Sequence, residues 1–257
     1  MELTTRDRVV GLLKTVGLNK VAARVVYRLE GFKSANTVVL GAIDRAFEYV
    51  RANGIAGDYL EFGVFKGASL LHAQRVADRL GLGRMRFIGF DSFQGLPSEP
   101  EQRTEIYYEG QYSCGEKQVR VWLSRHGADW QRLSLVPGFY DDTLTSKTKH
   151  DVGVTKCAVA MVDCDIYSST KAALTWLDDV IGPGSIVILD DWYAYGDDER
   201  SWLDGQKRAM KEYEQSSNWV FSELFSYAKG LRGGLAFICV RAKTASHPVD
   251  HVVESAC

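Results

Sequence analysis

Short apolar runs that alternate with longer amphipathic segments constrain the fold of this chain most strongly. Five runs are typical of strands, at residues 58–62, 86–90, 133–136, 157–162 and 186–189. Helical spacing of apolar residues marks the segments 68–80, 117–128 and 170–180. Strands separated by helices are typical of a parallel sheet covered on both faces. We therefore predict an α/β fold built on a doubly wound, mostly parallel sheet.

The C-terminal part of the chain departs from this alternation. A charged amphipathic helix at 199–216 is followed by two strand-like runs, 219–225 and 235–240. The segment between these runs, Lys229 to Gly234, is rich in glycine and shows no helical pattern. We predict an antiparallel terminal hairpin at one edge of the sheet, which would then be seven-stranded.

These patterns divide the chain into three parts. Residues 37–241 form the α/β domain, which begins with an amphipathic helix at 37–51. Residues 1–36 are mixed basic and apolar and indicate short N-terminal helices, either a structural cap or a lid that closes over a substrate. Residues 242–257 carry little pattern, and we expect a flexible tail.

The composition excludes several classes of protein. The net charge of −2 over 257 residues favours neither nucleic acid nor an anionic membrane as a partner. The 5 cysteines contain no CxxC pair, which indicates reduced thiols. The polar N-terminus is unlike a signal peptide, and no apolar run approaches the roughly 20 residues that span a membrane. We expect a cytoplasmic protein.

Carboxylates end two neighbouring strands of the predicted sheet. Asp163 and Asp165 follow the fourth strand, and Asp190 and Asp191 follow the fifth. The carboxyl ends of such strands meet at the edge where open α/β sheets bind ligands. Like charges that converge there cannot all stay ionised without a cation, and Mg²⁺ prefers hard oxygen ligands. We predict a magnesium site at Asp163, Asp190 and Asp191.

The first two strands end in features of a nucleotide site. Gly63 and Gly67 allow the backbone to approach a ligand, but their spacing is not the G-x-G-x-x-G of dinucleotide sites. Glu61 would repel a pyrophosphate and suits a cationic amine. Asp91 can hold both hydroxyls of a ribose. Together they favour S-adenosylmethionine over NAD, unless both acids are only capping or ion-paired residues.

The turn after the third strand offers further contacts to such a cofactor. Phe139, beside Gly138 and Asp141, can flank an adenine ring. Alternatively, Asp141 or Asp142 caps the turn that follows.

Asp165 is the candidate general base. A metal next to a substrate hydroxyl lowers the pKa of that hydroxyl, and a nearby carboxylate can then remove the proton. Asp165 shares a face with Asp163 if strand geometry continues that far. The alternative is that these acids are helix caps. Capping would account for Asp165, which precedes a helical segment, but not for four acids. The nearby Trp192, Tyr193 and Tyr195 can stack on a sugar or pack in the core.

These segments resemble the macrocin O-methyltransferase family, which includes sugar O-methyltransferases of antibiotic biosynthesis. The resemblance covers roughly residues 37–240 in five ordered blocks, 61–69, 90–97, 138–144, 162–170 and 190–192. It implies a Rossmann-like class I methyltransferase fold, S-adenosylmethionine and Mg²⁺ as cofactors, a glycoside as acceptor, and a homodimer or larger oligomer. N-terminal segments of the family cover the cleft.

The resemblance also implies roles for single residues. Asp163, Asp190 and Asp191 would hold the metal, and Asp165 would act as base with Asp163 beside it as the second catalytic residue. The residues of these blocks that we assign to the cofactor are Glu61, Gly63, Ser69, Asp91, Ser92, Gly138, Phe139 and Asp141.

One position separates the chain from catechol-type enzymes. Those enzymes carry a lysine three residues after the first metal aspartate, where this chain has Ile166. A lysine base and a catechol acceptor are therefore disfavoured. The alternatives are an O-methyltransferase of a phenol or another small hydroxylated molecule, and a non-catalytic nucleotide-binding protein of the same fold. The intact acids argue against the last.

Overall fold

The computed structural model describes residues 37–98, 107–196, 203–229 and 233–243. The strands in these ranges are β1 (Asp58–Phe62), β2 (Phe87–Asp91), β3 (Leu133–Pro137), β4 (Cys157–Val162), β5 (Ile186–Leu189), β6 (Trp219–Ser226) and β7 (Leu235–Ala242). The helices are α3 (Thr37–Ala52), α4 (Ala68–Arg79), α5 (Glu116–Arg125), α6 (Tyr140–Thr143), α7 (Ser146–Asp151), α8 (Tyr167–Leu177) and α9 (Gly205–Ser216). The cap or lid predicted at 1–36, and residues 244–257 of the predicted tail, lie outside the described residues.

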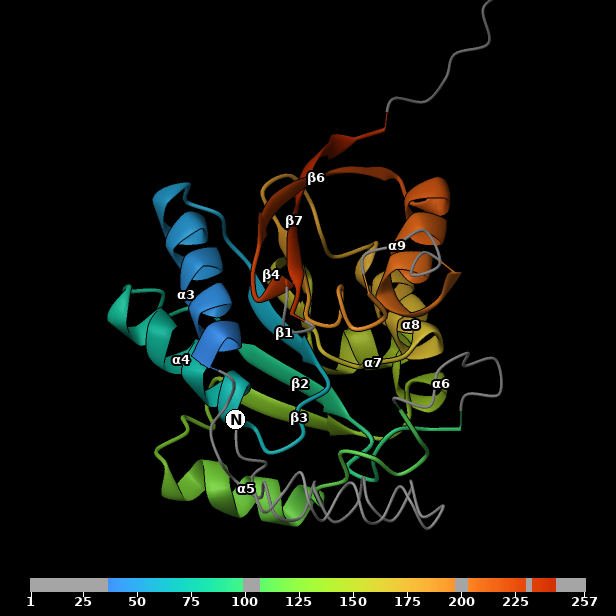
Figure 1. Ribbon diagram of the computed structural model, residues 1–257. Helices are drawn as coiled ribbons and strands as arrows, with labels where there is room; N and C mark the ends of the chain where they lie inside the picture. The colour runs from blue at the N-terminus through green and yellow to red at the C-terminus, as the bar shows by residue number, and fades with distance from the viewer. Residues whose placement is uncertain (1–36, 99–106, 197–202, 230–232, 244–257) are drawn as a thin grey trace, which may run out of the picture.

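A single seven-stranded sheet with the order β3-β2-β1-β4-β5-β7-β6 forms the centre of the molecule (Figure 1). Strands β1 to β5 pair in parallel, whereas β7 pairs antiparallel with both β5 and β6. The predicted doubly wound α/β fold and its antiparallel terminal hairpin are confirmed.

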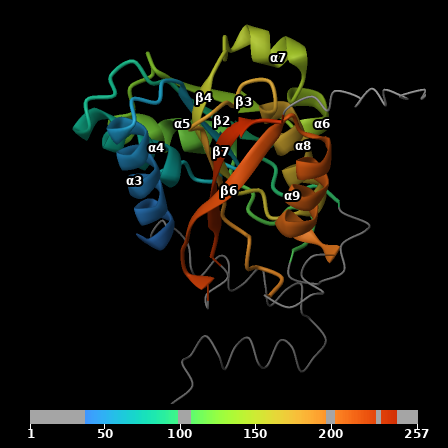
Figure 2. The ribbon, with the colours of Figure 1, turned by 90° about the horizontal axis from the view of Figure 1, so that it is seen from above.

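Helices cover both faces of the sheet. Figure 2 shows α3 and α4 on one side of the strands and α8 and α9 on the other. Neighbouring residues of a strand point to opposite faces, so Tyr59 joins the core under α3 and α4 while Leu60 joins the core under α8 and α9. Because β4 and β5 are buried on both faces, their sequences are continuous apolar runs rather than alternating ones.

The register of the central strands brings their carboxyl ends level. Phe62 is opposite Val162, and Val162 is opposite Leu189. The ladder then continues by one residue, because Asp163 N donates to Phe62 O at 2.8 Å and Asp190 N donates to Val162 O at 3.1 Å. The strand order reverses between β1 and β4, which is where ligands bind in open α/β sheets.

Several element boundaries differ from those expected. Helix α8 begins at Tyr167 rather than 170, because the Ser-Ser-Thr sequence forms its first turn and Thr170 N donates to Ile166 O at 3.1 Å. The short helices α6 and α7 were not anticipated, since helices of four and six residues are too short to show a repeat. None of the helices in the described ranges has the length and apolar character needed to cross a membrane.

Candidate active site

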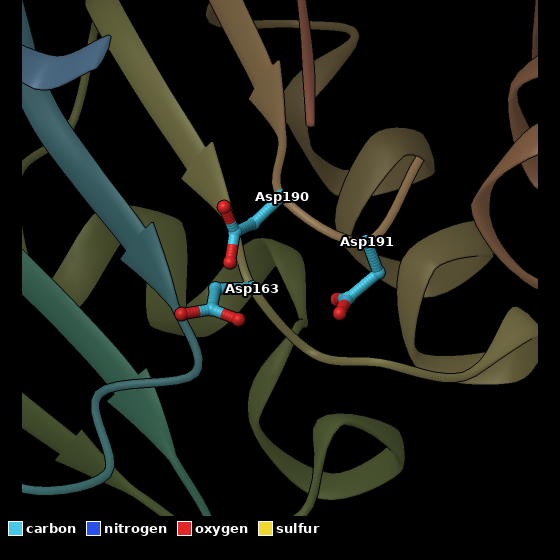
Figure 3. Close-up of side chains that lie close together, drawn as sticks. All are labelled: Asp163, Asp190 and Asp191. Atoms are coloured by element: carbon cyan, nitrogen blue, oxygen red, sulfur yellow. The ribbon is translucent and has the colours of Figure 1, made fainter. Parts of the chain in front are cut away.

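Three aspartates converge at the carboxyl ends of β4 and β5. Asp163, Asp190 and Asp191 each offer a carboxylate oxygen, and these oxygens all lie within 4.8 Å of one another. Figure 3 shows the side chains of Asp163 and Asp190 close together, with Asp191 turned toward them from the next residue. The parallel register therefore brings together the acids that the sequence assigned to a metal.

The cluster is electrostatically unfavourable by itself. Burial, followed by repulsion from Asp190, raises the pKa of Asp191 to about 7. Burial and the neighbouring carboxylates also raise the pKa values of Asp163 and Asp165 well above the ordinary range. A divalent cation would remove this repulsion, and an all-oxygen donor set is the set that Mg²⁺ prefers. The residues present thus fit a magnesium ion.

Asp165 lies beside the cluster but is no longer part of a strand. Strand β4 ends at Val162, and Asp165 adopts a left-handed conformation with φ of 64°. Its backbone N–H donates to Asp191 Oδ2 at 3.0 Å. Interaction with the Tyr107 hydroxyl partly offsets the rise in the pKa of the Asp165 side chain. The N-cap of α8 is Ile166, so Asp165 does not cap this helix as the alternative required.

The acids and most of the predicted cofactor residues line one cavity of about 1050 Å³. The acids that line it at the ends of β4 and β5 are Asp163, Asp165, Asp190 and Asp191. The predicted cofactor residues that line it are Gly63, Asp91, Ser92, Gly138, Phe139 and Asp141. This volume is at the upper end of the range of about 300–1,000 Å³ that is common for ligand pockets.

The Asp91 carboxylate accepts hydrogen bonds from the turn after β1 and from the turn after β2, on the cofactor side of the cavity. Asp91 Oδ2 accepts hydrogen bonds from the backbone N–H groups of Val64 and Phe65, both at 2.8 Å, and Oδ1 accepts from Phe93 N at 2.6 Å. Phe65 and Phe93 both have positive φ, so these bonds hold strained backbone in place. A carboxylate has about four acceptor positions, and one therefore remains for a ribose hydroxyl.

Glu61 and Ser69 do not line the cavity. Glu61 is completely buried, and it accepts hydrogen bonds from the hydroxyls of Tyr59 at 2.6 Å and Ser69 at 2.8 Å. Burial raises the pKa of Glu61 from 4.5 to about 8. The two predicted cofactor residues thus form a hydrogen-bonded pair in which Glu61 is buried and Ser69 is partly exposed.

Contacts and backbone conformation within the protein explain the two glycines after β1, whose φ angles are 96° for Gly63 and 81° for Gly67. A Cβ atom on Gly63 would lie 1.8 Å from the backbone oxygen of Asp163. A Cβ atom on Gly67 would lie 3.1 Å from Leu123 of α5. Close approach to a ligand, the reason given by the sequence, is therefore not needed to explain either glycine.

Two tyrosines, Tyr107 and Tyr195, lie beside the cluster. The Tyr107 hydroxyl donates to Asp191 Oδ1 at 3.1 Å, and its ring centroid lies 6.0 Å from that of Tyr195. Trp192 is instead buried against Phe237, with ring centroids 5.0 Å apart. Of the three aromatics that follow β5, Trp192 thus packs in the core and Tyr195 approaches the acids.

Two contacts of the cluster come from the C-terminal elements and were missed by sequence reasoning. Gln206, at the start of α9, accepts from Asp191 N at 2.9 Å and donates to Val162 O at 2.9 Å. Tyr227, after β6, donates its hydroxyl to Asp190 Oδ1 at 2.5 Å. Neither residue lies in a recognisable motif. The one related feature in the sequence is the glycine-rich segment that follows Tyr227, which predicts a turn but no contact with the acids.

Comparison with known proteins identifies similar sequences. The profile of the macrocin-O-methyltransferase (TylF) family matches residues 36–216. The 8-demethyl-8-(2,3-dimethoxy-alpha-L-rhamnosyl)-tetracenomycin-C 4'-O-methyltransferase of Streptomyces olivaceus is 32% identical over 152 residues, which are 56% of each chain. The mycinamicin III 3''-O-methyltransferase of Micromonospora griseorubida is 25% identical over 177 residues, 65% of this chain and 66% of that one. The chain thus matches less than two thirds of either relative's length.

Solved structures resemble the whole fold. The calicheamicin methyltransferase CalS11 superposes with a TM-score of 0.64 over 93% of this chain and 94% of its own, at 20% identity. At this identity the likeness shows a shared fold.

Proposed function

Because the chain belongs to the macrocin O-methyltransferase family, we propose that it is an S-adenosylmethionine-dependent and Mg²⁺-dependent O-methyltransferase. Its acceptor in this proposal is a sugar hydroxyl of a glycosylated natural product of antibiotic biosynthesis. The observation that carries the proposal is the convergence of Asp163, Asp190 and Asp191 within 4.8 Å at the edge of a cavity of about 1050 Å³. The names of the relatives, which methylate rhamnosyl-tetracenomycin and mycinamicin compounds, support the acceptor class.

Each group in the site has a proposed task. Asp163, Asp190 and Asp191 would hold Mg²⁺, which when bound lowers the pKa of an acceptor hydroxyl. Asp165 takes the proton of that hydroxyl while its oxygen accepts the methyl group from sulfur. Asp163 stands beside it as the second catalytic residue. Tyr107 donates its hydroxyl to Asp191 and therefore orients that acid.

The cofactor would lie along the other wall of the cavity. In this proposal Gly63, Ser92, Gly138 and Phe139 contact it directly, Asp91 holds its ribose and Asp141 its adenine. Glu61 and Ser69 do not line the cavity, and in this proposal they affect the cofactor through electrostatics rather than by direct contact. A cationic amine near them would stabilise the charged form of Glu61, whose pKa burial otherwise raises to about 8.

Calorimetric titration with S-adenosylmethionine, with and without Mg²⁺, tests the cofactor proposal. Mass spectrometry of desmethyl glycosides and simple phenols incubated with the protein tests the acceptor. We expect a gain of one methyl group on the glycoside, and only when Mg²⁺ is present. Absence of S-adenosylmethionine binding would remove the enzymatic proposal, and transfer to phenols alone would replace the acceptor class.

We also propose that the protein acts in the cytoplasm as a homodimer or larger homo-oligomer, with residues 1–36 as cap or lid and 242–257 as a tail. Light scattering of the purified full-length chain measures the assembly. A monomeric mass at micromolar concentration would contradict this part of the proposal.

A further inference from the structure

Tyr227, which directly follows β6, contacts the acidic cluster at Asp190. Its hydroxyl donates to Asp190 Oδ1 at 2.5 Å, and the residue is only 8% exposed. Its backbone N–H donates to Gly234 O at 3.0 Å, so the ring is held between the end of β6 and the start of β7. Tyr227 is not among the residues that line the cavity, and its hydrogen bond to the cluster is made to Asp190.

The glycine pair before β7 makes room for this contact. A Cβ atom on Gly234 would lie 2.4 Å from the Tyr227 hydroxyl and 2.4 Å from Leu189 O. A Cβ atom on Gly233 would lie 2.4 Å from Tyr227 O. Neither glycine has a positive φ, so the turn itself does not require them. What requires them is the close approach of Tyr227 to the end of β5, directly before Asp190.

We propose that Tyr227 is a positioning residue for Asp190, an inference that rests on the proposed metal site. The hydrogen bond to Oδ1 restrains the rotation of the Asp190 carboxylate. This carboxylate also interacts with Asp163, and one oxygen of each acid can then serve the same cation. Groups that orient metal-bound carboxylates in this way commonly affect metal affinity by about 10- to 100-fold. Gly233 and Gly234 support this role, because a side chain at either position would collide with Tyr227.

The chain contains a matched control for this contact. Tyr213 of α9 is 5% exposed, and its hydroxyl donates to Asp178 Oδ1 at 2.8 Å. The pair is a buried tyrosine–aspartate hydrogen bond like that of Tyr227, but it lies outside the cavity lining. Tyr213→Phe therefore removes the same kind of bond without affecting the acidic cluster.

The experiment measures Mg²⁺ binding to the full-length protein by calorimetry, with S-adenosylmethionine binding as the second readout. We expect Tyr227→Phe to weaken Mg²⁺ binding by about 10-fold or more, with S-adenosylmethionine affinity unchanged. In turnover assays, saturating Mg²⁺ should restore the kcat of this variant. Tyr213→Phe should bind Mg²⁺ like the wild type. Equal Mg²⁺ affinities in the wild type and Tyr227→Phe would overturn the inference and leave the proposed function intact.

A wild type that binds S-adenosylmethionine but no Mg²⁺ would overturn the proposed metal site and this inference together.

A second pair of variants tests the role of Tyr227 if Tyr227→Phe is insoluble. Gly233→Ala displaces the segment of the tyrosine, because the atoms nearest its Cβ position belong to Tyr227 and Ala228, whereas a Cβ atom on Gly182 meets nothing within 4 Å. The rise in unfolding temperature on adding Mg²⁺ should shrink in Gly233→Ala and persist in Gly182→Ala. An unchanged rise in both would contradict the role of Tyr227.

Discussion

Asp165 holds a backbone conformation that few residues adopt. Its φ of 64° is left-handed, where aspartate and asparagine are tolerated better than other residues with a side chain. Strained backbone of this kind is found most often at functional sites. The conformation turns the chain away from β4 and lets the backbone N–H of Asp165 reach Asp191.

The role of Asp165 as base is tested by Asp165→Asn. Asparagine accepts the same φ and keeps the shape of the side chain, so the fold and the affinity for S-adenosylmethionine should not change. The variant cannot take up the proton of the acceptor, and we expect kcat to fall by about 10²- to 10⁴-fold. Turnover kinetics beside a calorimetric titration measure both quantities. Turnover at the wild-type rate would assign the base to another residue.

Glu61 makes stability depend on pH. Its pKa is about 8 in the folded protein against an ordinary value of 4.5, so the folded state keeps a proton that the unfolded state loses. The stability that this group contributes is full below pH 4.5 and is lost as the pH rises to about 8. Glu61→Gln cannot titrate and keeps an acceptor for Tyr59.

We therefore expect the difference in unfolding free energy, wild type minus Glu61→Gln, to decrease by up to about 1.4 kcal/mol per pH unit over this interval. Urea unfolding of the cofactor-free proteins at several pH values measures it. A difference that stays constant with pH would show that Glu61 has an ordinary pKa.

The metal acids were predictable from the sequence, whereas their supporting residues were not. Asp163 and Asp190 each follow a buried apolar run, and parallel pairing brings the ends of such runs together. Gln206 of α9 and Tyr227 after β6 contact the acids, but they lie far from them in the sequence and belong to no recognisable motif. Periodicity shows that α9 has a buried face, but not which residue of that face meets Asp191.

At the scale of elements, the ends of β1 and β4 approach each other unusually closely. Gly63 lies where a Cβ atom would meet Asp163 O at 1.8 Å. Asp163, which follows β4, is also the first of the three proposed metal ligands. The distance between the ends of β1 and β4 therefore affects the position of a metal ligand.

Gly63→Ala should therefore separate the two strand ends. Gly127→Ala is the matched control, because Gly127 has φ of 83° against 96° for Gly63 and nothing within 4 Å of its Cβ position. Both variants carry the backbone strain of about 1–2 kcal/mol. Only Gly63→Ala adds the clash, and we expect a further loss of at least about 2 kcal/mol together with weaker Mg²⁺ binding. Chemical unfolding and calorimetry measure these effects, and equal losses in both variants would refute the argument.

The elements that the sequence predicted well are the buried ones. Strands β4 and β5 were placed with the same ends as observed, because burial on both faces gives continuous apolar runs. Helices α6 and α7 were missed because their positions depend on the turns around them rather than on a repeated apolar face.

At the scale of the whole molecule, the acidic cluster opposes folding unless a cation is bound. Burial and mutual repulsion raise the pKa values of Asp163, Asp165 and Asp191. Each therefore binds protons more tightly in the folded than in the unfolded state. The sign is the same as for Glu61, so the metal-free protein should lose stability as the pH rises toward 8.

Magnesium should reverse this loss. A ligand that binds only the folded state at 100 times its Kd adds about 2.7 kcal/mol, which corresponds to roughly 5–10 °C in unfolding temperature for a chain of this size. Asp190→Ala removes a ligand and also one of the repelling charges. The variant also leaves the buried Tyr227 hydroxyl without its acceptor, which costs about 1–3 kcal/mol, so its stability without Mg²⁺ reflects both changes. We expect this variant to show no stabilisation when Mg²⁺ is added. Differential scanning fluorimetry at pH 8 with and without Mg²⁺ measures this stabilisation. An undiminished magnesium effect in Asp190→Ala would place the ion elsewhere, because a site built from two strand ends cannot keep its affinity after losing the acid of one.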